Sequence, residues 1–286
     1  REITTGQFNN LLGGLAGDAL TVGTRNVAHG HSSLSSDTKG SKSVAVGMNA
    51  LFTQNFTTAT DTFNTAVGAD AGLSVTTGVQ NTLIGGLAGD ALTDADSNVA
   101  IGYLALSGDT LGSKSTAIGV GALESQNFTT ATDAYNTAVG FDAGVGITTG
   151  IRNAFLGAEA GAANTTGESN TYIGRQAGTL MTTGSNNTII GRYTGNQDSL
   201  DIRTVSNNII LSDGDGAGRF RANSSGQIVV GDGINSFGGG GYTNTAFTVN
   251  QDSNDYITAL RVNTGTAAAA YGIFIHYTAA APNNGQ

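Results

Sequence analysis

A glycine that recurs at a short, fixed period constrains the fold of this chain more than any other feature of its sequence. It ends a short unit of the form N-x-A-V/I-G, and the successive spacings along the chain are 17, 17, 21, 17, 17, 17, 21, 17, 17 and 17. Three coils of 17 and one of 21 make a block of 72, and residues 26–85 are identical to residues 98–157 at 37 of 60 positions. This indicates a tandem duplication of the 72-residue block, which itself consists of shorter repeats. The glycines are Gly13, Gly30, Gly47, Gly68, Gly85, Gly102, Gly119, Gly140, Gly157, Gly174 and Gly191.

Two columns of the repeat have a clear physical meaning. The residue before each glycine is aliphatic and mostly β-branched, except at His29, so we expect this column to face a core along a strand. The residue four positions before the glycine is asparagine, except at Ser43 and Ser115. Asparagines in register on stacked strands predict a ladder of side-chain amides that bond to the coils above and below. Its members are Asn9, Asn26, Asn64, Asn81, Asn98, Asn136, Asn153, Asn170 and Asn187.

Short strands joined by glycine turns predict an all-β fold, a β-solenoid or β-roll of eleven 17-residue coils over residues 1–195. The repeating glycine closes each strand, and a second turn follows at segments such as Thr76–Gly78. With about 4.8 Å between strands, eleven coils give a rod on the order of 50 Å long. A coil of this size encloses little core, which favours packing between subunits.

Beyond the eleventh coil the register loosens. Residues 196–236 are expected to form transition strands and turns, with one further strand of the repeat type at Asn207–Leu211 and a short alternating strand at Gln227–Val230. Residues 237–286 begin with the glycine-rich segment Gly238–Gly241 and then alternate between apolar and polar positions, as at Tyr271–Tyr277. We expect them to form a β-rich shaft segment that is truncated at its end.

The chain is also expected to begin inside a coil. Thr4–Gly6 aligns with Thr76–Gly78 at the 72-residue offset, and residue 1 is not methionine. We therefore expect a fragment or processed piece with further coils upstream.

The two longer coils each contain the segment QNFTTATD, at Gln54–Asp61 and Gln126–Asp133. Each segment lengthens its coil without disturbing the next glycine. It is either a tolerated surface loop or a protruding contact loop.

Composition and charge exclude several classes of function. The net charge of −9 and the scattered cations leave nothing to neutralise phosphates, so neither a nucleic-acid nor an anionic-membrane partner is expected. The chain has no cysteine, which excludes disulfides and cysteine-ligated metals. The longest apolar run, Ala267–Ile275, is too short for membrane insertion, and no apolar run near residue 1 suggests a signal peptide.

No catalytic residues, metal ligands or cofactors are predicted. His29 and His31 form an H-x-H pair that lacks a specified carboxylate partner. Asp213 and Asp215 resemble half of a calcium loop without its closing glutamate, and they fit a solvated turn better. No column of the repeat is acidic, as a glycosidase groove would need, and neither a phosphate loop nor a G-x-S-x-G segment is present. The chain is therefore not expected to be an enzyme.

Aromatic residues that the pattern places at the surface are the candidate receptor contacts. Tyr103 and Phe141 follow their glycines directly, and Phe56, Phe63, Phe128 and Tyr135 lie in or beside the long loops. Of these, Phe56, Tyr103, Phe128 and Phe141 are the receptor-binding candidates, for stacking on sugars or for packing between subunits.

The units NTAVGADAG, SNVAIGYLAL, KSTAIGVGAL and NTAVGFDAG resemble two related repeats. One is the head repeat of trimeric autotransporter adhesins, a β-roll packed as a trimer, whose period is usually shorter than the one seen here. The other is the similar repeat of bacteriophage tail fibres. The segments GQIVVGDG and ALRVNTGTAAAAYGIFIHY look like the shaft of phage fibres that precedes an endosialidase-type chaperone domain.

This resemblance implies an elongated homotrimer that serves as a virion tail fibre and attaches to a host surface. The implied partners are other tail or baseplate proteins and a bacterial surface glycan or protein receptor, at an extracellular location. The alternative from the same resemblance is a trimeric adhesin on the bacterial outer surface. A third class, a single-chain solenoid with a flat threonine face as in ice-binding proteins, predicts a regular T-x-T array that the threonines here do not form.

Overall fold

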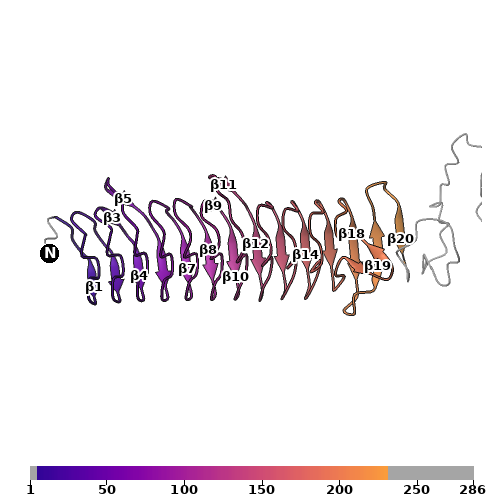
Figure 1. The fold of residues 1–286 in the computed structure, drawn as a ribbon, viewed down its shortest axis with the longest axis horizontal. Helices are drawn as coiled ribbons and strands as arrows, with labels where there is room; N and C mark the ends of the chain where they lie inside the picture. The colour runs from indigo at the N-terminus through magenta and orange to yellow at the C-terminus, as the bar shows by residue number, and fades with distance from the viewer. Residues whose placement is uncertain (1–4, 231–286) are drawn as a thin grey trace, which may run out of the picture. The chain divides into compact units, whose positions relative to one another are not determined.

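The protein is described by a computed structural model over residues 5–230, and the predicted shaft segment 237–286 lies outside the described residues. The described part is an all-β solenoid, which confirms the predicted fold class and coil length. One strand from each coil joins a single 14-stranded sheet, and these strands lie side by side in chain order (Figure 1). The sheet contains β1 (Asn10–Leu12), β2 (Val27–His29), β4 (Val44–Val46), β6 (Thr65–Val67), β7 (Thr82–Ile84), β8 (Val99–Ile101), β10 (Thr116–Ile118), β12 (Thr137–Val139), β13 (Ala154–Leu156), β14 (Thr171–Ile173), β15 (Thr188–Ile190), β18 (Ile209–Ser212), β19 (Gly218–Ala222) and β20 (Ile228–Val230).

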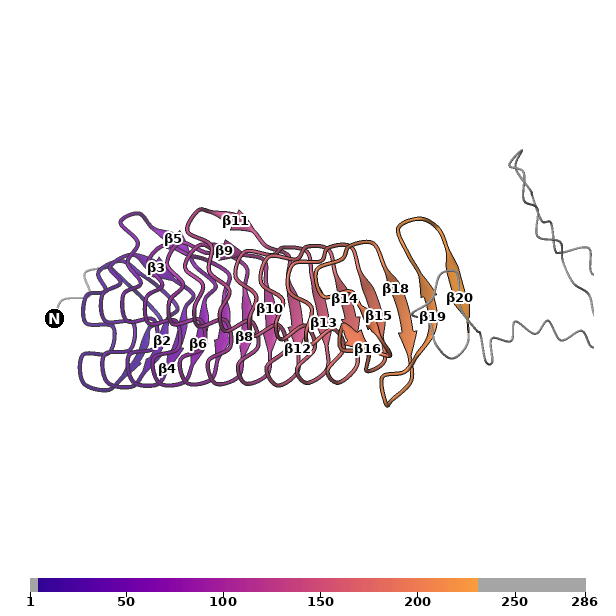
Figure 2. The ribbon, with the colours of Figure 1, turned by 45° about the vertical axis from the view of Figure 1, so that its right-hand side comes forward.

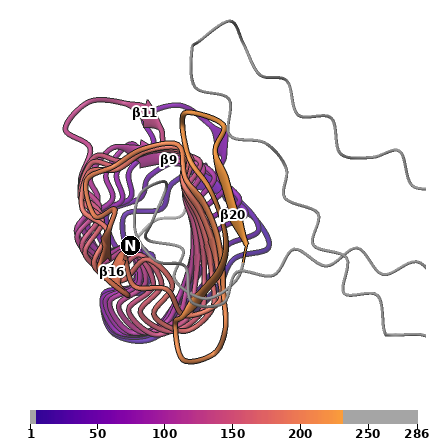
Figure 3. The ribbon, with the colours of Figure 1, turned by 90° about the vertical axis from the view of Figure 1, so that its right-hand side faces the viewer.

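Neighbouring strands pair in parallel and without a register shift from β1 to β18. Ala66 pairs with Leu83, and Ala117 pairs with Ala138 across one of the longer coils. Equivalent columns of the repeat therefore stack directly above one another, which is why the coils superimpose when viewed along the axis (Figure 3). The twelfth parallel strand, β18, corresponds to the additional strand expected at Asn207–Leu211.

The direction of each three-residue strand differs from the sequence prediction. The middle residue points inward and is fully buried in coil after coil, as at Ala100 and Ala138. The aliphatic residue before the glycine points outward, and Leu156 in this column is 51% exposed. Successive side chains of a strand alternate between its faces, so only one residue in three enters the interior. The column that was predicted to face the core therefore forms the outer face of the sheet. The middle residue of each strand, which is alanine in half of the coils, faces the core instead.

The narrow interior is filled by pairing large with small side chains. Most coils with alanine at the strand centre place a leucine in the following turn, as Ala117 does with Leu123. Coils with a large residue at the strand centre have glycine there instead. A methyl group on Gly161 would lie 2.8 Å from Cε1 of Phe155, and one on Gly178 would lie 2.7 Å from Cδ2 of Tyr172. The interior beside each strand thus has little room to spare, consistent with the close packing of protein interiors.

The repeating glycine is required by the approach of adjacent coils. Gly140 has a φ of +141°, and a Cβ there would lie 2.6 Å from both the carbonyl carbon and the carbonyl oxygen of Gly157. Its N–H donates to the carbonyl of Ile118 in the preceding coil at 2.8 Å. A side chain at this position would both strain the backbone and separate the coils.

Each of the two longer coils adds a small parallel ladder beside the main sheet. The strand β3 (Gly40–Ser41) pairs with β5 (Thr60–Asp61), and β9 (Gly112–Ser113) pairs with β11 (Thr132–Asp133). Both insertions rise along the same edge of the solenoid (Figure 2).

The regular coils end in antiparallel structure. A hairpin of β16 (Asn196–Gln197) and β17 (Leu200–Asp201) precedes β18, and β18, β19 and β20 then pair antiparallel. The parallel stacking therefore stops at β18 within the described residues. Among those residues there is also no helix with the length and hydropathy needed to cross a membrane.

Replacing a repeating glycine should cost far more stability than replacing a turn glycine at a position that has room for a Cβ. Gly140→Ala should lower the free energy of unfolding by at least about 3 kcal/mol, because it combines backbone strain with a clash against the next coil. Gly86→Ala is the control, since its new Cβ would come no closer than 3.5 Å to a neighbouring atom, the ring carbon Cδ2 of Tyr103. Urea unfolding followed by circular dichroism measures both. Equal losses in the two variants would contradict this account of the repeat.

Candidate functional site

The asparagine column forms a continuous buried ladder along the solenoid. Oδ1 of Asn81 accepts from the backbone N–H of Asn98 at 3.0 Å, and its Nδ2 donates to the carbonyl of Ala95 at 2.7 Å. Asn153 makes the same two bonds, to the N–H of Asn170 at 3.0 Å and to the carbonyl of Gly167 at 2.9 Å. Each asparagine therefore satisfies two backbone groups of the next coil that burial would otherwise leave without partners.

The ladder is repaired at the two coils where serine replaces asparagine. Near Ser115, Nε2 of Gln126 donates to the serine Oγ at 3.0 Å, and Oε1 of Gln126 accepts from Nδ2 of Asn136 at 2.8 Å. Gln54 makes the equivalent bonds to Ser43 and Asn64, both at 2.9 Å. The first residue of each QNFTTATD segment thus bridges the gap left by the short serine side chain.

A buried aspartate anchors each insertion, and the sequence analysis did not single it out. Oδ1 of Asp109 accepts from the backbone N–H groups of Gly112 and Phe128, both at 3.0 Å, and its Oδ2 accepts from Nε2 of Gln126 at 2.5 Å. Asp37 bonds in the same way to Gly40, Phe56 and Gln54. A signal was present in the sequence. The coil before each insertion places aspartate seven positions after its glycine, where five of the other coils have an apolar residue, such as Val75 or Leu92.

The receptor-binding candidates divide into buried and exposed rings. Tyr103 and Phe141 are exposed, at 53% and 54%. Phe56 and Phe128 are each only 6% exposed. The expectation that these two rings lie at the surface is therefore wrong. The backbone N–H of each residue donates to the buried aspartate of its insertion.

The exposed aromatic residues beside the insertions are instead Phe63 and Tyr135, which directly precede the ladder asparagines Asn64 and Asn136. They are 51% and 53% exposed, and each lies beside a lysine. Nζ of Lys42 is 4.8 Å from the ring centroid of Phe63, and Nζ of Lys114 is 5.2 Å from that of Tyr135.

The histidines and carboxylates noted in the sequence do not gather into a metal site. Nε2 of His29 contacts Oδ1 of Asn10 at 3.2 Å, and Nδ1 of His31 contacts Oγ of Ser32 at 3.0 Å. Oδ1 of Asp213 accepts from the N–H of Asp215, and its Oδ2 accepts from Arg219. Within residues 5–230, no group of three histidine, aspartate or glutamate side chains is placed to hold a metal ion.

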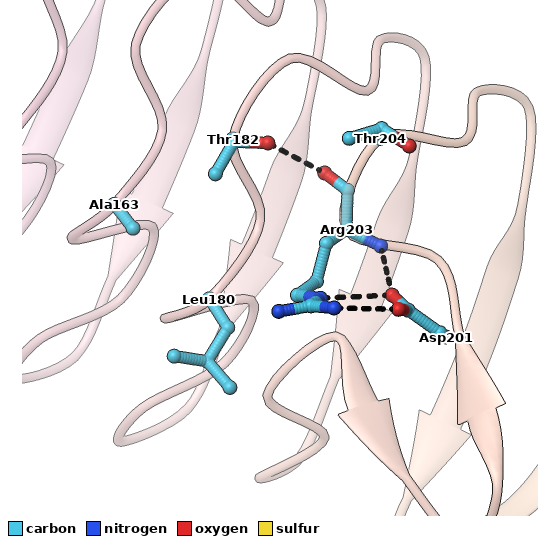
Figure 4. Close-up of a pocket in the computed structure, with 6 residues that line it drawn as sticks. All are labelled: Ala163, Leu180, Thr182, Asp201, Arg203 and Thr204. Atoms are coloured by element: carbon cyan, nitrogen blue, oxygen red, sulfur yellow. Dashed lines mark hydrogen bonds and ion pairs between the residues drawn. The ribbon is translucent and has the colours of Figure 1, made fainter.

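An open pocket of about 390 Å³ lies at the hairpin of β16 and β17 (Figure 4). Arg203 and Asp201 dominate it and bind each other through two contacts, at 3.0 Å from Nε and 2.7 Å from Nη2. These contacts lower the pKa of Asp201 to about 2, so the pair stays ionised and mutually satisfied at neutral pH. The pocket brings together no nucleophile and base. Its lining residues are Ala163, Leu180, Thr182, Asp201, Arg203 and Thr204.

The outer face of the parallel sheet carries a column of aliphatic side chains, interrupted at His29, beside a column in which half of the residues are threonine. The outward column before the repeating glycine includes Ile84, Ile118 and Ile190, which are 37%, 36% and 42% exposed. The second outward column holds threonine, valine or alanine in most coils, as at Thr82 and Val99. An exposed column of aliphatic side chains that runs along a sheet is characteristic of an interaction face.

Comparisons with protein-family models, with curated proteins and with solved structures find no match to this chain. The site is therefore defined by its geometry alone.

Removing one rung of the ladder should destabilise the solenoid. Asn81→Ala leaves the buried N–H of Asn98 and the carbonyl of Ala95 without their partners, and we expect a loss of about 2–4 kcal/mol in the free energy of unfolding. Asn127→Ala is the matched control, because this exposed asparagine accepts one surface bond, from Oγ1 of Thr110 at 3.2 Å. It should change stability by no more than about 0.5 kcal/mol. Chemical denaturation measures the free energy of unfolding of both variants. If Asn81→Ala is as stable as Asn127→Ala, the asparagine ladder does not stabilise the solenoid.

Proposed function

We propose that this chain is a structural fibre of a phage virion, a tail fibre that mediates attachment to the host surface. The observation that carries the proposal is the unbroken stack of coils with an apolar outer sheet face. The β-solenoid fold is typical of structural proteins, and the proposal treats the chain as a non-enzyme without cofactors. Its location is the virion, outside the cell.

The stacking supports a rigid spacer. Twelve parallel strands at about 4.8 Å each give a rod on the order of 60 Å long within the described residues. Every coil is joined to the next by the strand ladder and by side-chain amides, so bending the rod would break buried hydrogen bonds. A rod of this kind holds a binding surface away from the particle that carries it.

The apolar outer face supports assembly into a homotrimer. Burying this face against two further copies removes the exposed isoleucine and leucine side chains from water, at about 25 cal/mol per Å² of apolar surface. The number three comes from the resemblance to trimeric adhesin and phage-fibre repeats. Three copies also multiply weak receptor contacts through avidity.

The proposed partners are other tail or baseplate proteins at one end and a bacterial surface glycan or protein as the receptor. The alternative is a trimeric adhesin on the bacterial outer surface, which requires a membrane anchor elsewhere in the protein. Antibodies against the solenoid distinguish the two, because they label tail appendages in the first case and intact cells in the second.

The assembly is tested by the native mass in solution. Light scattering should give about three times 28.7 kDa. Ile118→Lys should dissociate the trimer with its circular dichroism unchanged, because three ammonium groups would be buried near one another. Phe52→Lys is the control, since Phe52 has a similar exposure of 37% but lies outside the sheet. A wild type with the mass of a single chain would contradict the trimer and favour the single-chain solenoid, whose outer sheet face stays in water.

A further inference from the structure

Each insertion presents the same exposed cluster of a ring, an ammonium group and a carboxylate. Nζ of Lys114 lies 2.5 Å from Oδ2 of Asp133 and 3.3 Å from the hydroxyl of Tyr135, which in turn donates to Asp133 at 3.3 Å. The mutual hydrogen bond raises the pKa of Lys114 and lowers that of Asp133, so both groups remain charged.

The first insertion repeats this arrangement four coils away. Nζ of Lys42 lies 2.5 Å from Oδ2 of Asp61 and faces the ring of Phe63. In both copies the side chains of the ion pair are roughly one-third to one-half exposed. We call the set Lys42, Asp61 and Phe63 the first cluster, and the set Lys114, Asp133 and Tyr135 the second cluster.

Buried side chains and short strand ladders hold both clusters in place. The buried aspartate and the nearly buried phenylalanine of each insertion fix the loop, and the short ladders of β3 with β5 and of β9 with β11 fix the strand that ends in the cluster aspartate. The neighbouring threonines of each loop, Thr57 with Thr58 and Thr129 with Thr130, are exposed. A preorganised polar surface of this kind loses little conformational entropy when it binds.

A comparison of the two 72-residue copies singles out this surface. Several surface positions elsewhere have changed between the copies, such as His31 to Tyr103, Met48 to Val120 and Phe52 to Glu124, whereas Thr77 is retained as Thr149. The insertion segment QNFTTATD is identical in both copies, exposed residues included, and the lysine and the aromatic character are retained beside it. Buried anchoring explains the glutamine and the phenylalanine, but it does not explain the retained exposed threonines and the ion pair.

We propose that the two clusters are equivalent subsites for one hydroxyl-rich polysaccharide chain of a cell surface, running along the insertion edge of the solenoid. This inference rests on the proposed attachment function and names its receptor class and its residues. The ring offers an apolar face to the C–H side of a sugar, the ammonium donates to hydroxyl oxygens, and the carboxylate accepts from hydroxyl groups through charge-assisted bonds. Four coils at about 4.8 Å separate the subsites by about 19 Å, so a polymer of several sugars reaches both.

The test uses the full chain and an array of immobilised bacterial capsular polysaccharides and lipopolysaccharide O-chains. The wild type should bind at least one polymer. The double variant Phe63→Ala/Tyr135→Ala should weaken that binding by about 100-fold or more, and either single variant by about 10-fold, because one subsite then acts without the avidity of the other. The double variant Lys42→Ala/Lys114→Ala should also weaken binding while leaving the rings in place.

Phe52→Ala is the matched control, because Phe52 is an exposed aromatic residue, at 37%, that belongs to neither cluster. Binding of no polymer, or equal binding by the wild type and the Phe63→Ala/Tyr135→Ala variant, would overturn the proposal. Loss of the oligomer in that variant would instead assign the clusters to a subunit contact and overturn it too. Light scattering on the same samples separates these outcomes from the fibre proposal, which stands or falls with the native mass.

Discussion

The absence of a side chain at the glycine that closes each strand is the constraint on which the rest of this structure depends. With a Cβ at Gly140, the carbonyl of Gly157 could not lie where it does, and the spacing of the parallel strands would be lost. That spacing brings the side-chain amide of one asparagine within reach of the N–H and carbonyl groups of the next coil. The glycine column and the asparagine column therefore depend on each other. The glycines allow adjacent coils to approach closely, and the asparagines form hydrogen bonds to the backbone polar groups that this approach buries.

The same close stacking leaves room for very little core. Most coils hold either a leucine from the turn beside an alanine of the strand, as at Leu123 and Ala117, or a large strand residue beside a glycine, as at Tyr172 and Gly178. Much of the aliphatic content therefore ends up on the outer face of the sheet, where burial needs another molecule. A thin solenoid with one apolar face is suited to assembly, which is the physical basis for the proposed trimer.

The two longer coils show how a strict repeat can carry a variable surface. Serine breaks the asparagine ladder at these coils, and glutamine from the insertion restores it, while a buried aspartate holds the loop against the rod. Each inserted segment can then place its aspartate beside a lysine and an aromatic ring from the flanking residues without disturbing the coils above and below. The asparagine ladder ends where the parallel coils end. There Arg221 on β19 donates to Oδ1 of the last ladder asparagine, Asn208, at 3.3 Å.

The sequence by itself determined the period, the number of repeating coils, the in-register stacking and the columns of glycine and asparagine, because a stacked repeat reproduces every local constraint at each turn. It did not determine which side of a three-residue strand faces inward. Alternation allows both choices, and the turns that close the coil select the alanine side. It also did not separate Phe56 and Phe128, which are buried, from Phe63 and Tyr135, which are exposed. The path of each insertion decides that, and the path follows from a buried carboxylate whose hydrogen-bond donors come together only in the folded coil.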